Sequence, residues 1–393
     1  MMKIGLATFF DSNYGSSLQC FATKTFLESL NVKCDVLYKF VTNSKWNQIK
    51  QRFKNYTQML FHPSFFRYKL ECRRRKRDLW CKNPTEQTRM LINSFVNERI
   101  QPKIVSNSEL KNKKWQQQYD YFITGSDQVW NIDTIDNDFF FLTFAYKKKR
   151  IALATSFGIS VVPSYNEKKF KLLINGFDYI SVREETGVDI VQKYSSARVV
   201  RIADPTLVYS DDEWRGFIKE RESIATKYIL IHFLNNPNNT ALESISWLSE
   251  QQNLDIIAIG YNYDRFKTLK RLTFMDGNPL KYVSLIDCAE YILTDSFHST
   301  LFSINFSKKF YTFHRQYLFR PQTSRISDLL KRYNLNYRLI DDIRIIKNSF
   351  KEEIPIKVKE KLNHERLIIR DYIKKAISGQ IPQCFLEGEN NAT

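Results

Sequence analysis

One unit recurs along this chain: a short apolar stretch of β-favouring residues leads into a polar cluster, and a segment of helical spacing follows. It is clearest in residues 291–305, YILTDSFHSTLFSIN, where Tyr291–Thr294 has the pattern of a buried strand and the apolar run 300–306 has helical length. Strands that alternate with helices in this way fold into parallel sheets covered by helices. The chain is therefore predicted to be an α/β protein.

The polar cluster inside this stretch is the first candidate site. Ligands bind parallel sheets beyond the carboxyl ends of the strands, where the N–H groups of helix N-termini are unpaired. Ser296 and His298 are accordingly expected at an anion-binding position. The alternative is that Asp295 and Ser299 cap the helix and that His298 packs beside them.

The units fall into two series, which predicts two Rossmann-like domains in a GT-B-like arrangement with a cleft between them. A chain of 393 residues, 43% of them apolar, is long enough for two hydrophobic cores. We expect a first domain over residues 1–210, a linker over 211–227, a second domain over 228–345, and a C-terminal segment over 346–393 with a closing helix at Lys357–Ile377. The predicted strands are Lys3–Phe9, Lys33–Leu37, Tyr119–Thr124, Arg150–Thr155, Tyr179–Val182 and Arg198–Ala203 in the first series, and Tyr228–Phe233, Leu254–Ile259, Tyr291–Thr294 and Phe310–Phe313 in the second.

Polar clusters also follow the strands of the first series. In the loop NYGSS, Gly15 permits the backbone to approach a ligand, but the G-x-G-x-x-G fingerprint is missing, so a nicotinamide dinucleotide site is disfavoured. Residues 125–127, Gly-Ser-Asp, have the pattern either of a ligand contact or of a turn. For Asp204-Pro205 a chain-turning element is favoured over chemistry.

Cysteines and histidines give no sign of a metal centre. The six cysteines are scattered without a C-x-x-C pair, which argues against a zinc site or a disulfide framework and fits a reducing cytoplasm. His62, His314 and His364 lack partners at ligand spacing, and His232 lies among apolar residues and is expected in the core or at its rim. We therefore predict neither a metal nor a cofactor, and no apolar run is long enough to span a membrane.

A basic amphipathic insertion interrupts the α/β rhythm between Lys45 and Lys82. It holds twelve Lys and Arg residues against two acidic ones, a large share of the formal net charge of +18. Ile49, Phe53, Tyr56 and Leu60 recur at helical spacing, and RRRKR follows at Arg73–Arg77. Three interpretations stay open: a helix packed on the domain with a solvated face, a patch for an anionic membrane surface, or a nucleic-acid grip. No nucleic-acid fold signature accompanies the run, so nucleic acid is not the expected partner.

Taken together, the polar clusters resemble the polysaccharide pyruvyl transferase family. The motifs occur in family order over roughly residues 3 to 340: NYGSSLQ (Asn13–Gln19), GSDQVWN (Gly125–Asn131), SFG (Ser156–Gly158), SVREETG (Ser181–Gly187), DPTLV (Asp204–Val208), TDSFHSTLFSINFSKKF (Thr294–Phe310) and SRISDLL (Ser324–Leu330). The resemblance implies a two-domain GT-B fold. It also implies transfer of the enolpyruvyl carbons of phosphoenolpyruvate onto two hydroxyls of a sugar, with release of phosphate and formation of a pyruvate ketal.

Carried over to this chain, the resemblance implies that Arg183 and His298 meet the donor across the cleft. Many members have Arg at the position of Ser296, so the missing cation is expected from Arg325, Arg320 or Lys308. Residues expected to contact substrate are Asn13, Tyr14, Gly15, Gln19, Ser126, Gln128, Arg183, Ser296 and Arg325.

The chemistry of these residues suits such a reaction. A guanidinium such as Arg183 can fork onto a phosphate or carboxylate, and each charge-assisted hydrogen bond contributes roughly 1.5–3 kcal/mol. His298 is the expected acid, since an unperturbed imidazole titrates near pH 6.5. Asp127 or Glu184 is the expected base.

The acceptor implied by the family is a sugar on a lipid-linked glycan precursor at the cytoplasmic face of the membrane. The basic insertion, residues 45–82, would then dock a cytoplasmic enzyme on the anionic bilayer, because each Lys or Arg near such a surface contributes about 1 kcal/mol. Two rival functions stay open: a nucleotide-sugar glycosyltransferase of the same GT-B shape, and a catalytically inactive scaffold of a glycan-assembly complex.

Overall fold

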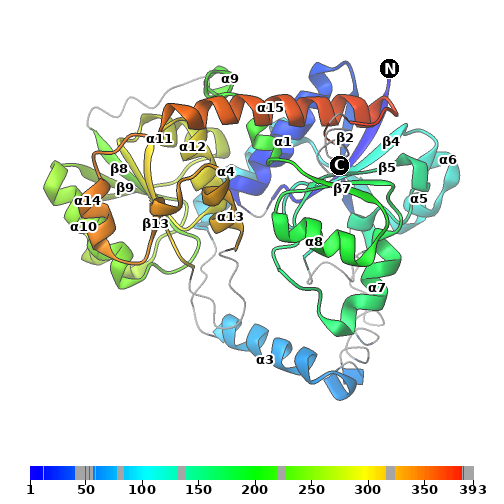
Figure 1. Ribbon diagram of the computed structural model, residues 1–393, viewed down its shortest axis with the longest axis horizontal. Helices are drawn as coiled ribbons and strands as arrows, with labels where there is room; N and C mark the ends of the chain where they lie inside the picture. Colours follow the sequence, from blue (N-terminus) through cyan, green and yellow to red (C-terminus); the bar gives the residue numbers. More distant parts are fainter. Residues whose placement is uncertain are drawn as a thin grey trace, which may run out of the picture.

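Two parallel sheets form the framework of the molecule in the computed structural model (Figure 1). The structure describes residues 1–11, 13–39, 49, 53, 56–57, 59–77, 84–131, 138–218, 227–315, 324–382 and 384. One sheet has seven strands in the order β3-β2-β1-β4-β5-β6-β7, and the other has six in the order β10-β9-β8-β11-β12-β13. Every strand pair is parallel. The predicted α/β class with two Rossmann-like domains is confirmed.

The first sheet and its helices come from the N-terminal half of the chain. Its strands are β1 (Lys3–Ala7), β2 (Lys33–Lys39), β3 (Lys103–Val105), β4 (Tyr121–Thr124), β5 (Arg150–Thr155), β6 (Tyr179–Val182) and β7 (Arg198–Arg201). Its helices are α1 (Tyr14–Ser29), α4 (Glu86–Phe95), α5 (Asn107–Lys111), α6 (Lys113–Gln116), α7 (Ser164–Ile174) and α8 (Glu185–Tyr194), while α3 (Pro63–Arg77) lies at the edge of the molecule, away from both sheets (Figure 1).

The second sheet comes from the C-terminal half. Its strands are β8 (Tyr228–His232), β9 (Asp255–Ile259), β10 (Leu272–Met275), β11 (Tyr291–Thr294), β12 (Lys309–Phe313) and β13 (Leu339–Ile340). Its helices are α10 (Asn239–Gln252), α11 (Pro279–Cys288), α12 (Phe297–Asn305), α13 (Ser324–Arg332) and α14 (Ile343–Ser349), and α15 (Ile356–Ile377) follows at the end. β11, the turn and α12 match the strand–turn–helix unit predicted for residues 291–305.

The expected linker over residues 211–227 begins as a helix. α9 (Asp211–Phe217) starts with a capping box in which the Ser210 hydroxyl accepts from the Glu213 N–H and the Glu213 carboxylate accepts from the Ser210 N–H. Its Trp214 is fully buried and donates to the Thr206 carbonyl at 2.9 Å. The charged residues Asp212 and Glu213 therefore lie on the solvent face of a packed helix. Residues 219–226 lie outside the described part of the chain.

Each sheet has a point where the strand order reverses. In the first sheet it lies between β1 and β4, and in the second between β8 and β11. Ligands of open parallel sheets bind in the crevice at such a point, outside the carboxyl ends of the strands. The chain therefore offers two crevices, one for each domain.

Contacts from α1 and α15 hold the two domains against each other. The Tyr14 ring stacks on Tyr282 with centroids 4.6 Å apart, and the Tyr14 hydroxyl donates to the Gly277 carbonyl at 3.0 Å. α15 lies across the top of both domains in Figure 1. Its Tyr372 hydroxyl donates to the carbonyl of Ala152, in β5, at 2.7 Å, and Arg366 donates to Asn305 at the end of α12. The two halves are thus tied into one body.

His232 is a buried histidine of the second core. Its Nδ1 lies 2.7 Å from the Ser299 hydroxyl, and burial holds its pKa at about 3, below the ordinary value of 6.5. The prediction that His232 belongs to the core is confirmed. As pH falls from about 6.5 to 3, the unfolded chain binds a proton here that the folded chain excludes. This group therefore lowers the free energy of unfolding as pH falls, by up to about 1.4 kcal/mol per pH unit.

We predict that His232→Gln flattens the pH dependence of stability between pH 6 and pH 4. The measurement is the free energy of unfolding in urea at several pH values. His364→Gln, on the exposed side of α15, is the matched control and is expected to keep the wild-type slope. Equal slopes for wild type and His232→Gln would contradict the assignment.

Candidate active site

A hollow of about 300 Å³ lies between the two domains, within the size range of small-molecule sites. Its walls come from the loops that follow β1, β4, β8, β11 and β12, and from the start of α13. The lining residues are Phe9, Asn13, Asp127 and Gln128 from the first domain, and Leu234, Ser296, Phe297, His298, Arg315 and Arg325 from the second. The crevices of the two sheets therefore contribute to one shared site, which is the cleft that the sequence predicted.

The second-domain wall is built around Asp295 and the N-terminus of α12. The Asp295 carboxylate accepts from the N–H groups of Leu234 at 2.6 Å and Asn235 at 2.9 Å, which ties the loop after β8 to the loop after β11. Burial raises the pKa of Asp295 above its ordinary value. Ser296 is the N-cap of α12, and its hydroxyl accepts from the Ser299 N–H at 3.4 Å. The alternative expectation that Asp295 caps this helix is wrong, because its carboxylate accepts from N–H groups of the loop after β8 and Ser296 is the N-cap.

Two arginines of the second domain line the hollow. Arg315 donates from Nε to the Asp295 carbonyl at 2.8 Å. Arg325 faces Gln128, whose side-chain oxygen accepts from Arg325 Nη2 at 2.7 Å when the amide is oriented toward it. Burial and the charges of Arg183 and Arg315 lower the pKa of Arg325 to about 10.

These arginines bear on the cation expected in place of the family's Arg at Ser296. Arg325 lines the hollow together with Ser296, whereas Lys308 does not line it and Arg320 lies outside the described residues. Arg315 was not among the predicted site residues. Its position shortly after a predicted strand, at the carboxyl end of the sheet, is the sequence signal that could have identified it.

Phe297 contacts two guanidinium groups. Its ring centroid lies 4.4 Å from Cζ of Arg183 and 5.9 Å from Cζ of Arg325. Both distances are within the range of cation–π attraction, which holds a cation over an aromatic face. The aromatic residue in the S-F-H motif thus has an arginine partner from each domain.

His298, the second residue of α12, reaches both domains. A Cβ atom on Gly15 would lie 2.0 Å from His298 Nδ1, so the space that a side chain would occupy at Gly15 is taken by the imidazole. On the other edge of the ring, Nε2 lies 3.8 Å from Asp204 Oδ2. Gly15 was expected to admit a ligand, and here it admits the ring of His298.

Arg183 is buried and paired. Its Nη1 donates to Asp204 Oδ2 at 2.6 Å, and its side chain lies 3.6 Å from Glu184 and 3.9 Å from Asp127. Burial alone would lower the pKa of Arg183, but these three carboxylates outweigh that effect and raise it. The Arg183 and His298 side chains therefore converge on one carboxylate, Asp204, although Arg183 itself lies behind the wall of the hollow.

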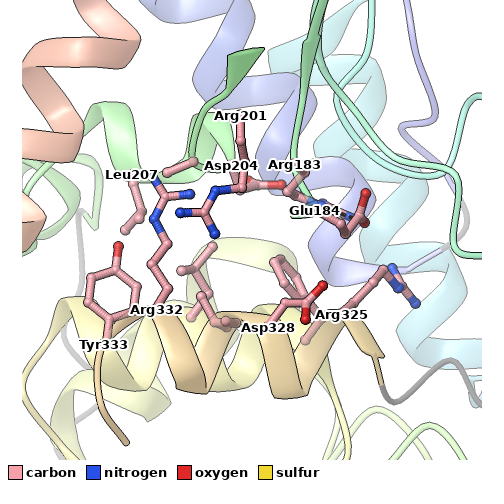
Figure 2. A pocket seen from close by; sticks show the side chains of 13 residues that line it. Arg183, Glu184, Arg201, Asp204, Leu207, Arg325, Asp328, Arg332 and Tyr333 are labelled. Carbon is pink, nitrogen blue, oxygen red and sulfur yellow. Dashed lines mark hydrogen bonds and ion pairs between the residues drawn. The ribbon is translucent and has the colours of Figure 1, made fainter. Parts of the chain in front are cut away.

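A second, smaller pocket adjoins the hollow and shares Phe297 and Arg325 with it (Figure 2). Figure 2 shows α13 presenting Asp328 and Arg332 toward Arg183 and Arg201 of the first domain. Glu184 lines this smaller pocket, where its carboxylate accepts from the Ser156 hydroxyl. Of the two expected bases, only Asp127 lines the hollow.

Three further predicted residues support the site from behind. Tyr14 is packed between the domains as described above. Gln19 is fully buried, and its amide donates to Phe9 O at 2.6 Å and to Thr8 Oγ1 at 2.9 Å, which fixes the loop after β1. The Ser126 hydroxyl donates to Ala154 O at 3.0 Å and lies 3.1 Å from Asp204 Oδ2.

Within the described residues, no group of three or more His, Cys, Asp or Glu side chains is arranged to hold a metal ion. The same part of the chain contains no helix with the length and apolarity needed to cross a membrane.

Comparison with solved structures defines the class of fold. The S. aureus MnaA–UDP structure is similar over 93% of this chain and 90% of that one, with 12% identity and a TM-score of 0.51. A UDP-N-acetylglucosamine 2-epimerase structure is similar over 95% of each chain, with 8% identity and a TM-score of 0.52. At such low identity the likeness concerns the fold alone, a GT-B-like pair of parallel α/β domains. No curated protein matches the sequence.

The sequence profile of the polysaccharide pyruvyl transferase family matches residues 13–317, which is most of the chain. The chain belongs to this family. It is therefore a pyruvyl transferase of polysaccharide biosynthesis.

We predict that Gly15→Ala displaces the His298 ring, because the new methyl group would overlap Nδ1. Overpacking of this kind costs about 1–3 kcal/mol of unfolding free energy. Gly216→Ala is the matched control, since a Cβ there meets nothing within 4 Å, and it is expected to be neutral or slightly stabilising. The measurements are urea unfolding and the NMR signals of the His298 ring, and an unmoved His298 signal in Gly15→Ala would contradict the prediction.

Proposed function

We propose that this protein transfers the pyruvyl group of phosphoenolpyruvate onto two hydroxyls of a sugar, forming a cyclic ketal and releasing phosphate. The observation that carries the proposal is the hollow itself. Two arginines, a histidine and the N-terminus of α12 meet there, opposite the carboxylate of Asp127 on the other domain. Such a set suits a small donor that bears both a phosphate and a carboxylate.

The second domain would bind the donor. Arg315 and Arg325 would each contact an oxyanion of phosphoenolpyruvate, and the unpaired N–H groups in the first turn of α12 would receive the other oxygens. Arg183 would hold Asp204 in place instead of binding the donor, because its Nη1 already pairs with Asp204 Oδ2 at 2.6 Å. This assignment moves the expected anchor of the donor from Arg183 to the two arginines that line the hollow.

The reaction needs one acid and one base. A proton is added to the methylene carbon of phosphoenolpyruvate, and a sugar hydroxyl attacks the neighbouring carbon, which becomes cationic as the double bond is lost. The second hydroxyl then displaces phosphate at the same carbon and closes the ketal ring. Both hydroxyl protons are released, so one replaces the proton consumed and the other leaves with phosphate. His298 is the proposed acid and Asp127 the proposed base.

The sugar acceptor would enter from the first-domain side. Phe9, half-buried beside the hollow, offers an apolar face for a sugar ring, while Asn13 and Asp127 offer polar groups for its hydroxyls. This orientation would leave Asp127 next to the acceptor and His298 next to the donor, as their proposed parts require.

We predict that the pure protein releases phosphate from phosphoenolpyruvate when a suitable glycoside is present. The panel should include aryl and lipid-linked glycosides, and mass spectrometry should find a gain of one pyruvate minus water on the acceptor. Arg315→Gln and Arg325→Gln should each lower kcat/KM for phosphoenolpyruvate by about 10- to 100-fold, the value of one charge-assisted hydrogen bond. Arg344→Gln, a highly exposed arginine of α14, should leave it unchanged.

Turnover of a nucleotide sugar without any consumption of phosphoenolpyruvate would overturn the proposal in favour of a glycosyltransferase. Unchanged cellular function in Arg325→Gln and His298→Ala would instead favour the catalytically inactive scaffold.

A lipid-linked acceptor would require the enzyme to work at the membrane, and α3 and the residues before it are suited to that. Large apolar side chains of this segment are exposed, among them Phe53, Leu60, Phe61, Phe66 and Leu70. Phe65 is the exception, since its ring packs edge-on against Tyr165 of α7 at 5.0 Å and anchors the helix to the first domain. The basic residues interspersed among them complement an anionic surface.

We predict that the protein floats with anionic liposomes but not with neutral ones. Leu60→Ser with Phe61→Ser should reduce flotation, because the two side chains are 79% and 78% exposed and their replacement leaves the core intact. Leu172→Ser, equally exposed on α7, is the control and should float like wild type. Neutralising Arg73–Arg77 should also release the protein. Unchanged flotation in both variants would exclude membrane docking through α3.

A further inference from the structure

Asp204 is a carboxylate that side chains of both domains approach at this site. It follows strand β7 after two connecting residues, and its side chain is fully buried. Oδ1 builds the local turn, accepting from the Thr206 N–H at 2.9 Å and from the Thr206 hydroxyl at 2.8 Å. Oδ2 faces the site, with Arg183 Nη1 at 2.6 Å and His298 Nε2 at 3.8 Å. The turn expected for Asp204-Pro205 is present, but it occupies only half of the carboxylate.

The surroundings keep this carboxylate charged. Burial alone would raise the pKa of Asp204, but His298, Arg183 and the Thr206 N–H hold it well below its ordinary range. An ionised carboxylate beside an imidazole stabilises a proton on the nitrogen that faces it. Nε2 is buried and faces Asp204, whereas Nδ1 lies at the edge of the ring that packs on Gly15.

We infer that Asp204 is a positioning residue for His298: it holds the Nε2–H edge of the ring toward the first domain and leaves Nδ1 as the nitrogen for the substrate. The inference deepens the proposed pyruvyl transfer and rests on it for its catalytic meaning. Because Asp204 belongs to the first domain and His298 to the second, the pair depends on the contact between the two domains.

Other charged or titratable groups also lie around the His298 ring. Asp127 lines the hollow from the first domain, and Arg315 and Arg325 line it from the second. His232 lies on the neighbouring strand β8, where its low pKa keeps it neutral. Of these groups, Asp204 is the carboxylate that pairs with the ring, with Oδ2 at 3.8 Å from His298 Nε2.

The first test uses the wild-type protein without substrate. The nitrogen shifts of neutral His298 in long-range ¹H–¹⁵N spectra report which nitrogen carries the proton. We expect the Nε2–H form. An Nδ1–H form would overturn the inference, and this measurement needs no variant that must fold.

The second test compares replacement of the carboxylate with replacement of a residue that bonds to it. Asp204→Asn should remove the preference for the Nε2–H form in the nitrogen shifts of neutral His298, because the carboxylate that faces Nε2 is gone. Thr206→Val removes only the hydroxyl that bonds Oδ1. It should lower the melting temperature while leaving the His298 nitrogen shifts at their wild-type values. Unchanged nitrogen shifts in folded Asp204→Asn would reduce Asp204 to a structural residue.

The third test is kinetic. Asp204→Asn should lower kcat by about 10²-fold, the lower end of what a positioned acid contributes, with little change in KM for phosphoenolpyruvate. If wild type releases no phosphate from phosphoenolpyruvate, the proposed function fails while the two NMR results still decide the part played by Asp204.

Discussion

Tyr14 stacks on Tyr282 and donates a hydrogen bond to Gly277, so the first turn of α1 is inserted into the second domain. The next residue, Gly15, gives way to the ring of His298. One helical turn therefore aligns the domains and defines the position of the proposed acid. The same contact brings the strand-order reversals of the two sheets to face each other, and the hollow is the space between them.

The arginines of the site differ in how closely carboxylates surround them. Arg183 is buried against Asp204, Glu184 and Asp127, and its positive charge is already compensated. Arg325 contacts the Gln128 amide and the Phe297 ring, while Arg315 contacts the Asp295 carbonyl and lies 3.8 Å from the Asp295 carboxylate. A buried charge that loses its partner costs several kcal/mol, which explains why a residue such as Arg183 suits a fixed support better than a group that must exchange ligands.

Periodicity and turn residues were enough to predict the two domains, the closing helix and the unit at residues 291–305. Three strands escaped prediction: β3 and β13 have only three and two residues, and β10 is an edge strand without a fully buried residue, so none carries a clear apolar pattern. The lining residues Asn13, Asp127, Gln128, Ser296, His298 and Arg325 were named from motifs. Arg183, Tyr14, Gln19 and Ser126 were named for the same reason but do not line the hollow. A motif identifies which loops meet; the direction of each side chain depends on packing from elements far away in the chain.

α15 has a consequence for how the enzyme is made. Its Tyr372 bonds to Ala152, a residue 220 positions earlier, and its Arg370 bonds to the carbonyl of Val208. During synthesis the first sheet leaves the ribosome long before the helix that spans it. The contacts of α1 between the two domains can therefore form before those of α15, which are added only after residues 356–377 have been made.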